Sequence, residues 1–164
     1  SINYPSLAVI QDGRKIQYIH QVKAATAEFY HKMDPKVGLL KLIPGIDGKV
    51  LDALFPSYSG LIIESFGVGG LPHYENDNFI DAIAHWIEAG KPVCMATQVT
   101  HEGSDMEVYQ VGKVIKERFP VLESYDMTLE ASVTKMMWAL GQTRDMEKFK
   151  ELFYTTINHD LLFL

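Results

Sequence analysis

Three short apolar runs in the middle of the chain restrict its possible folds more than any other feature. They cover residues 37–43, 60–66 and 92–97, and the first two are closed by Pro44-Gly45 and by a glycine-rich stretch. Runs of this length are typical of parallel strands that are covered on both faces. Helix-period patterns separate them, so the sequence predicts a strand-helix alternation that builds a parallel sheet.

Amphipathic patterns at helical spacing lie between these runs and continue after them. They cover residues 50–55, 79–87, 108–119, 129–140 and 146–153. The second has Asp77 as its predicted N-cap and Gly90 as its stop, whereas the fourth has Asp126 before it and Gly141 just past its end. The sequence therefore predicts an α/β fold in which a small parallel sheet carries helices on both faces, as in Rossmann and flavodoxin-like βαβ proteins.

A β-hairpin is predicted at residues 7–20, because Asp12-Gly13 lies between two apolar stretches and favours a tight turn. A lone hairpin is marginally stable in water, so we expect it to pair with strands outside this sequence. The chain also starts at Ser1 and enters apolar sequence at once, as a segment of a longer protein would. The predicted domains are 1–36, a hairpin and connector left over from an N-terminal domain, and 37–164, the α/β domain.

The composition argues against several classes of protein. The net charge is −6 and no basic stripe is present, which disfavours a nucleic-acid partner. No apolar run approaches the roughly 20 residues of a membrane span, and no signal peptide is visible. A single cysteine, Cys94, allows no internal disulfide and fits a reducing compartment.

The glycine-rich stretch Gly67-Val68-Gly69-Gly70 directly follows the second run. Ligands bind beyond the carboxyl ends of parallel strands, and glycines there let a backbone approach them. Pro72 departs from the dinucleotide-binding fingerprint and removes an N–H that a phosphate could use. Three interpretations of this stretch therefore remain. In order of preference, they are a tight turn at the strand end, a surface that contacts a ligand or partner, and a dinucleotide site.

Other chemistry-bearing residues have structural explanations from local pattern. His73, His85 and His101 match no metal-ligand spacing, and Cys94 lies inside an apolar run where a buried thiol is expected. In the polar segment 100–109, Ser104 and Glu107 form a predicted capping box. Asp105 could act as a carboxylate acceptor, and Glu102 has no such local role. No nucleophile constellation is present, so no catalytic residue, metal or cofactor is predicted from spacing alone.

Several longer stretches resemble the bacterial type I (cytoplasmic) L-asparaginases. They are S-I-N-Y-P-S-L-A at 1–8, L-K-L-I-P-G at 40–45, I-E-S-F-G-V-G-G-L-P at 63–72 and Thr97-Gln98. The stretch D-M-T-L-E-A-S-V-T-K-M-M-W-A-L-G-Q at 126–142 is the longest and most specific. The resemblance runs through essentially the whole chain, and it covers the C-terminal half of that family plus the end of its N-terminal domain.

This resemblance implies an enzyme that hydrolyses the side-chain amide of L-asparagine to L-aspartate and ammonia. The family's threonine nucleophile lies in its N-terminal domain with a T-G-G-T opening, which does not occur in these 164 residues. The isolated chain is therefore expected to be inactive. Family members are cytoplasmic homodimers or homotetramers without cofactors, and the C-terminal domain of one subunit closes a neighbouring active site.

The resemblance also implies which residues face that neighbouring site. In the related secreted class, the neighbour supplies an Asn from the glycine loop and a Glu from the following polar loop. Here the glycine loop is Gly67, Gly69 and Gly70, with Gly70 at the Asn position, and the polar loop offers Glu102, Ser104 and Asp105. Some type I enzymes have a regulatory asparagine site that uses an Arg and a Cys, where this chain has Glu64 and Val99.

Two alternatives remain from the sequence. One is an asparaginase-like subunit of a tRNA-dependent amidotransferase, for which a nucleic-acid partner would be expected. The other is a non-catalytic α/β module that binds a small ligand or a protein partner.

Overall fold

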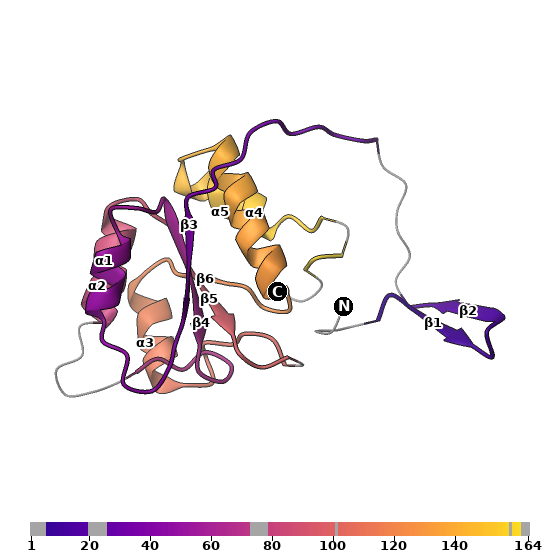
Figure 1. The fold of residues 1–164 in the computed structure, drawn as a ribbon, viewed down its shortest axis with the longest axis horizontal. Helices are drawn as coiled ribbons and strands as arrows, with labels where there is room; N and C mark the ends of the chain where they lie inside the picture. Colours follow the sequence, from indigo (N-terminus) through magenta and orange to yellow (C-terminus); the bar gives the residue numbers. More distant parts are fainter. Residues whose placement is uncertain (1–5, 20–25, 73–78, 101, 158, 162–164) are drawn as a thin grey trace.

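A computed structural model describes residues 6–19, 26–72, 79–100, 102–157 and 159–161. The first described segment is the predicted hairpin, in which β1 (Ala8–Gln11) pairs antiparallel with β2 (Lys15–Tyr18). Asp12 and Gly13 form its turn, both with positive φ, as expected of a tight hairpin turn. The hairpin stands apart from the rest of the described chain (Figure 1), and nearly all its residues are exposed.

The second sheet is parallel and has the strand order β3-β4-β5-β6. Its strands are β3 (Val37–Lys41), β4 (Gly60–Ser65), β5 (Val93–Thr97) and β6 (Leu122–Glu123). The first three coincide with the three apolar runs and confirm that prediction. The fourth was not predicted, because two residues are too few to produce a recognisable apolar run.

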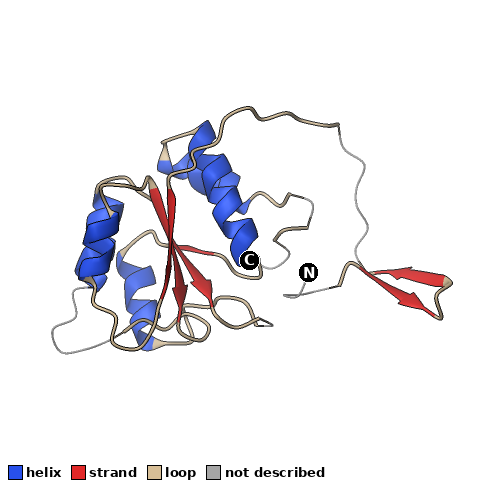
Figure 2. Cartoon of the chain, viewed as in Figure 1, coloured by secondary structure: helices blue, strands red, loops and turns tan. Residues whose placement is uncertain are grey.

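Helices cover both faces of the parallel sheet, which confirms the predicted fold class (Figure 2). One face carries α1 (Lys49–Leu54), α2 (Phe79–Glu88) and α3 (Gln110–Arg118). The other carries α4 (Leu129–Gln142) and α5 (Met146–Tyr154). Two hydrophobic cores result, one on each side of the sheet.

Strand β4 connects these two cores because its side chains alternate between the two faces. Leu61 and Ile63 are fully buried with Trp86 of α2, whereas Ile62 is fully buried with Phe149 of α5. The Trp86 indole N–H donates to the Leu51 carbonyl oxygen at 3.1 Å, so this large side chain leaves no polar atom unpaired.

Several predicted helix ends differ from the structure. The N-cap of α4 is Thr128, whose hydroxyl accepts the Ala131 N–H, so the prediction of Asp126 was wrong by two residues. Gly141 lies inside α4 rather than past its end, and a Cβ there would lie 2.5 Å from the Lys32 carbonyl oxygen. Gly90 follows α2 with a φ of 72°, which confirms the predicted stop. Asp77 falls outside the described residues.

The described part of the connector, residues 26–36, forms neither helix nor strand and contacts the C-terminal part of α4. The Asp34 N–H donates to the Met137 carbonyl oxygen at 2.9 Å, and Tyr30 packs edge-on against Trp138. Arg144 forms an ion pair with the Asp34 carboxylate. None of the helices in the described part of the chain is long and apolar enough to cross a membrane.

Candidate functional site

The glycine-rich stretch forms a tight turn at the carboxyl end of β4, as the preferred interpretation predicted. Phe66 and Gly70 exchange backbone hydrogen bonds of 2.9 and 2.7 Å, and Gly67 has a φ of 50° that suits glycine. The Thr97 hydroxyl at the end of β5 donates to the Gly67 carbonyl oxygen. The turn is therefore held to the neighbouring strand end.

The polar loop 102–107 lies directly against this turn. The Asp105 N–H donates to the Val68 carbonyl oxygen at 2.6 Å. A Cβ on Gly69 would lie 2.9 Å from the Met106 Cα, and one on Gly112 of α3 would lie 2.5 Å from the Met106 carbonyl oxygen. Backbone thus packs on backbone at both positions, which only glycine allows. The structure brings together the two segments that the sequence singled out.

Ser104 holds the same loop to the residues after β6, and it does not cap a helix. Its hydroxyl accepts the Tyr125 N–H at 2.7 Å, and its own N–H donates to the Tyr125 carbonyl oxygen at 2.8 Å. The predicted capping box was wrong, because α3 begins at Gln110 and its N-cap, Tyr109, makes no side-chain cap hydrogen bond. The capping sequence is overridden by a tertiary contact that buries Ser104.

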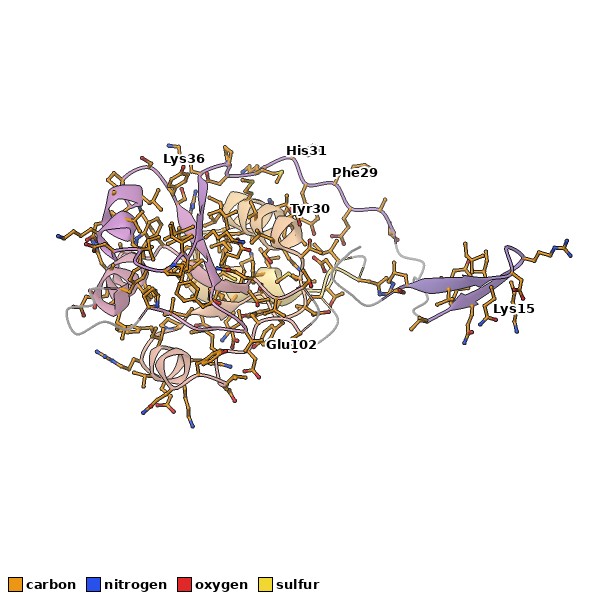
Figure 3. All side chains as sticks on the ribbon, turned by 60° about the horizontal axis from the view of Figure 1, so that its bottom comes forward. Lys15, Phe29, Tyr30, His31, Lys36 and Glu102 are labelled. Carbon is orange, nitrogen blue, oxygen red and sulfur yellow. The ribbon has the colours of Figure 1, made fainter. Side chains whose placement is uncertain are left out.

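Acidic side chains line the outside of the loop. Glu102 is exposed at a bend, and Figure 3 shows it on the opposite side of the α/β body from connector residues Phe29 and His31. The Asp105 carboxylate accepts the Glu107 N–H at 2.9 Å and is also exposed. Glu102 and Asp105 are therefore both exposed carboxylates on this loop, and an exposed carboxylate suits a cationic ligand group.

Beneath the loop lies a buried carboxylate that sequence reasoning missed. The Glu123 side chain is 1% exposed, and its Oε1 lies 2.6 Å from the Lys116 Nζ. Hydrogen bonding to Glu123 raises the pKa of the Lys116 ammonium above its ordinary value of 10.5, although burial acts in the opposite direction. No local pattern pointed to this pair, because Lys116 belongs to α3 and Glu123 to an unpredicted strand.

The remaining candidates have other surroundings. Cys94 is fully buried, which confirms its predicted role, and burial raises the pKa of its thiol far above the ordinary value. His85 is exposed and stacks on Phe55, and its Nδ1 lies 3.8 Å from the Asp52 Oδ1. His73 and His101 fall outside the described residues. Within the described ranges, no cluster of three or more His, Cys, Asp or Glu side chains could hold a metal ion.

Comparison with known proteins gives a consistent family signal. Residues 36–153 match the model of the glutaminase/asparaginase C-terminal domain. An L-asparaginase of Thermococcus kodakarensis is 36% identical over 159 residues, which is 96% of this chain and 47% of that protein. A component of the glutamyl-tRNA(Gln) amidotransferase of Pyrococcus abyssi is 31% identical over 94% of this chain and 35% of that protein.

Solved structures agree with these sequence matches. The thermostable L-asparaginase of T. kodakarensis superposes with a TM-score of 0.84 at 34% identity, over 100% of this chain and 49% of that one. L-asparaginase I of Vibrio cholerae superposes with a TM-score of 0.78 at 25% identity, over 99% of this chain and 49% of that one. The chain thus spans half the length, or less, of the relatives that it matches.

Proposed function

This chain belongs to the glutaminase/asparaginase C-terminal domain family, and from this premise we propose that it is the C-terminal domain of an L-asparaginase. The observation that carries the proposal is the match to the family over residues 36–153, which include the whole parallel sheet. In this proposal residues 37–164 form the domain, and residues 1–36 are the end of an N-terminal domain. The whole enzyme hydrolyses L-asparagine to L-aspartate and ammonia with a threonine nucleophile outside this chain.

The domain's own part in this reaction is to close the active site of a neighbouring subunit. The glycine turn at Gly67, Gly69 and Gly70 supports the loop, Ser104 holds the loop to Tyr125, and the loop offers the exposed carboxylates of Glu102 and Asp105. An exposed carboxylate on a loop that is fixed at several backbone positions suits recognition of the α-ammonium group of asparagine. The enzyme would work as a homodimer or homotetramer, and the exposed apolar side chains of the hairpin, such as Ile10 and Ile16, would pack against other parts of the protein.

An ammonia-release assay tests this function. The full-length protein should hydrolyse L-asparagine at about one turnover per second or more. The isolated 164-residue chain should show no turnover, because it contains no nucleophile constellation. Asparagine hydrolysis by the isolated chain, or none by the full-length protein, would refute the proposal. Size-exclusion chromatography with light scattering checks the assembly, and cell fractionation checks the proposed cytoplasmic location.

A second candidate function is that of an ammonia-releasing component in a tRNA-dependent amidotransferase. The similarity to the P. abyssi protein at 31% identity favours it. The two functions differ in whether a tRNA is required, since an asparaginase acts on the free amino acid alone. Full activity on free L-asparagine without glutamyl-tRNA supports the first function, and activity that depends on the tRNA supports the second. Binding of asparagine without turnover under either condition would indicate a non-catalytic module.

A further inference from the structure

Glu123 is the most deeply buried acidic side chain among the described residues, and its two oxygens have different partners. Oε2 accepts the backbone N–H of Met106 at 2.8 Å, in the middle of the polar loop. Oε1 faces the Lys116 ammonium of α3 at 2.6 Å. One carboxylate therefore connects β6, α3 and the loop.

A buried ion pair is costly to maintain, and replacing both of its partners by apolar residues often leaves a protein as stable or more stable. Lys116 has a second acidic partner, and that ion pair differs from the buried one in its exposure to solvent. Glu107 lies 3.1 Å from the same ammonium but is 67% exposed, so that contact contributes little. The ion pair to Glu123 neutralises the buried charge, and the hydrogen bond to Met106 is the interaction that an apolar residue could not replace.

Met106 is also the residue at which the loop packs most tightly against its neighbours. Its side chain is fully buried, and its backbone lies between Gly69 and Gly112. Four residues earlier, Glu102 projects from the exposed side of the loop. A shift of the backbone at Met106 would reach Glu102 through Asp105 and Ser104, and it would strain their hydrogen bonds to Val68 and Tyr125 on the way.

We propose that Glu123, neutralised by Lys116, is a positioning residue that fixes the Met106 backbone and so sets the placement of Glu102 for the ammonium group of the substrate. This inference rests on the proposed function for its substrate, but its structural half stands on the Met106 hydrogen bond. Glu123 itself contacts no substrate. It acts only through the loop.

The test compares substitutions at Glu123 with a matched substitution at Glu107. Glu123→Ala removes both contacts, and Glu123→Gln keeps the length of the side chain and an oxygen that can accept the Met106 N–H. Glu107→Ala removes the exposed partner of the same lysine. Amide hydrogen exchange at Met106 is measured in this chain, and kcat and KM for L-asparagine are measured in the full-length protein.

Glu123→Ala should accelerate exchange at Met106 and raise KM by about tenfold or more, the change expected when a hydrogen bond to a charged group is lost. Its kcat should stay within about threefold, because the nucleophile is untouched. Glu123→Gln should keep both the Met106 exchange rate and KM close to those of the unsubstituted protein, and Glu107→Ala should change neither the exchange rate nor KM. If Glu123→Ala does not fold, Glu123→Asp takes its place, since it keeps the charge but is too short to reach both partners.

Unchanged KM and Met106 exchange in the Ala or Asp variant would overturn the inference. A loss of active protein with unchanged KM would overturn it too, because that pattern reports a purely structural role. If the full-length protein has no activity on L-asparagine, the proposed function fails. Met106 exchange then decides the positioning role by itself.

Discussion

Replacing Gly112 by alanine tests how closely α3 must approach the polar loop. Gly112 is the third residue of α3, and an ideal Cβ there would lie 2.5 Å from the Met106 carbonyl oxygen and 3.2 Å from the Gly69 carbonyl oxygen. Ordinary van der Waals contact begins near 3.4 Å, so helix and loop would have to separate by roughly 0.9 Å. Both obstructing atoms are backbone atoms, which cannot rotate away as a side chain can.

Two effects of opposite sign decide the result. Glycine to alanine in a helix normally stabilises a protein by up to about 1 kcal/mol. Overpacking against fixed neighbours costs about 1–3 kcal/mol, and the separation would also stretch the hydrogen bond between Met106 and Glu123. We therefore expect Gly112→Ala to lower the free energy of unfolding by about 1–2 kcal/mol, which is a fall in Tm of about 2–8 °C for a chain of this size.

Urea unfolding followed by circular dichroism measures the change, with the midpoint shifted and the slope m preserved. Lys113→Ala is the matched control, because its side chain is exposed on the same helix. It should stay within about 0.5 kcal/mol of the unsubstituted chain. If Gly112→Ala is as stable as the unsubstituted chain, or more stable, helix propensity has prevailed and the backbone contact at Met106 is not tight.

Three further predictions concern other parts of the chain. In the full-length protein, Glu102→Ala should lower kcat/KM for L-asparagine by about tenfold or more with the assembly intact, and wild-type kinetics would show that Glu102 is only a surface residue. Burial pushes the pKa of Asp34 upward, but hydrogen bonds from Arg144, the Lys36 N–H and Ser59 outweigh it, so the pKa lies below the ordinary 3.8. Because that folded-state pKa is depressed, Asp34→Asn should lower the free energy of unfolding by about 1 kcal/mol at pH 7. This loss should shrink as the pH falls below 3.8, where the carboxylate becomes protonated. An equal loss in urea titrations at pH 7 and at about pH 3 would contradict the prediction. Cys94 should resist a thiol reagent in the folded chain and react on unfolding in urea, whereas rapid labelling without urea would mean that its strand opens easily.

Local sequence patterns were sufficient for the elements that are built from contiguous runs. The three apolar runs became β3, β4 and β5, and Asp12-Gly13 made the hairpin turn. These features depend on neighbours within a few residues, so a period of about 2 or 3.6 and a turn-forming pair are enough to predict them. The resemblance of 126–142 to the asparaginases likewise needed only the order of residues.

The candidate site was predicted only in part. The glycine turn and the loop carrying Glu102, Ser104 and Asp105 were both singled out, because polar segments after parallel strands lie at the same edge of the sheet. Their direct contact through Val68 and Asp105 was not predicted, and the assigned role of Ser104 was wrong. A capping sequence states only what a residue could bond locally, and a partner 21 residues away outweighed it.

The sequence by itself determined an α/β chain with a hairpin, three strands, five helices and a resemblance to one enzyme family. Only the tertiary structure decided that a two-residue strand completes the sheet, that Glu123 is buried beneath the loop, and that Gly69 and Gly112 enclose Met106. The physical reason is that burial of a charge and close approach of two backbones depend on segments distant in sequence. A lone glutamate after an apolar pair has the same local pattern whether it faces water or a lysine of another element.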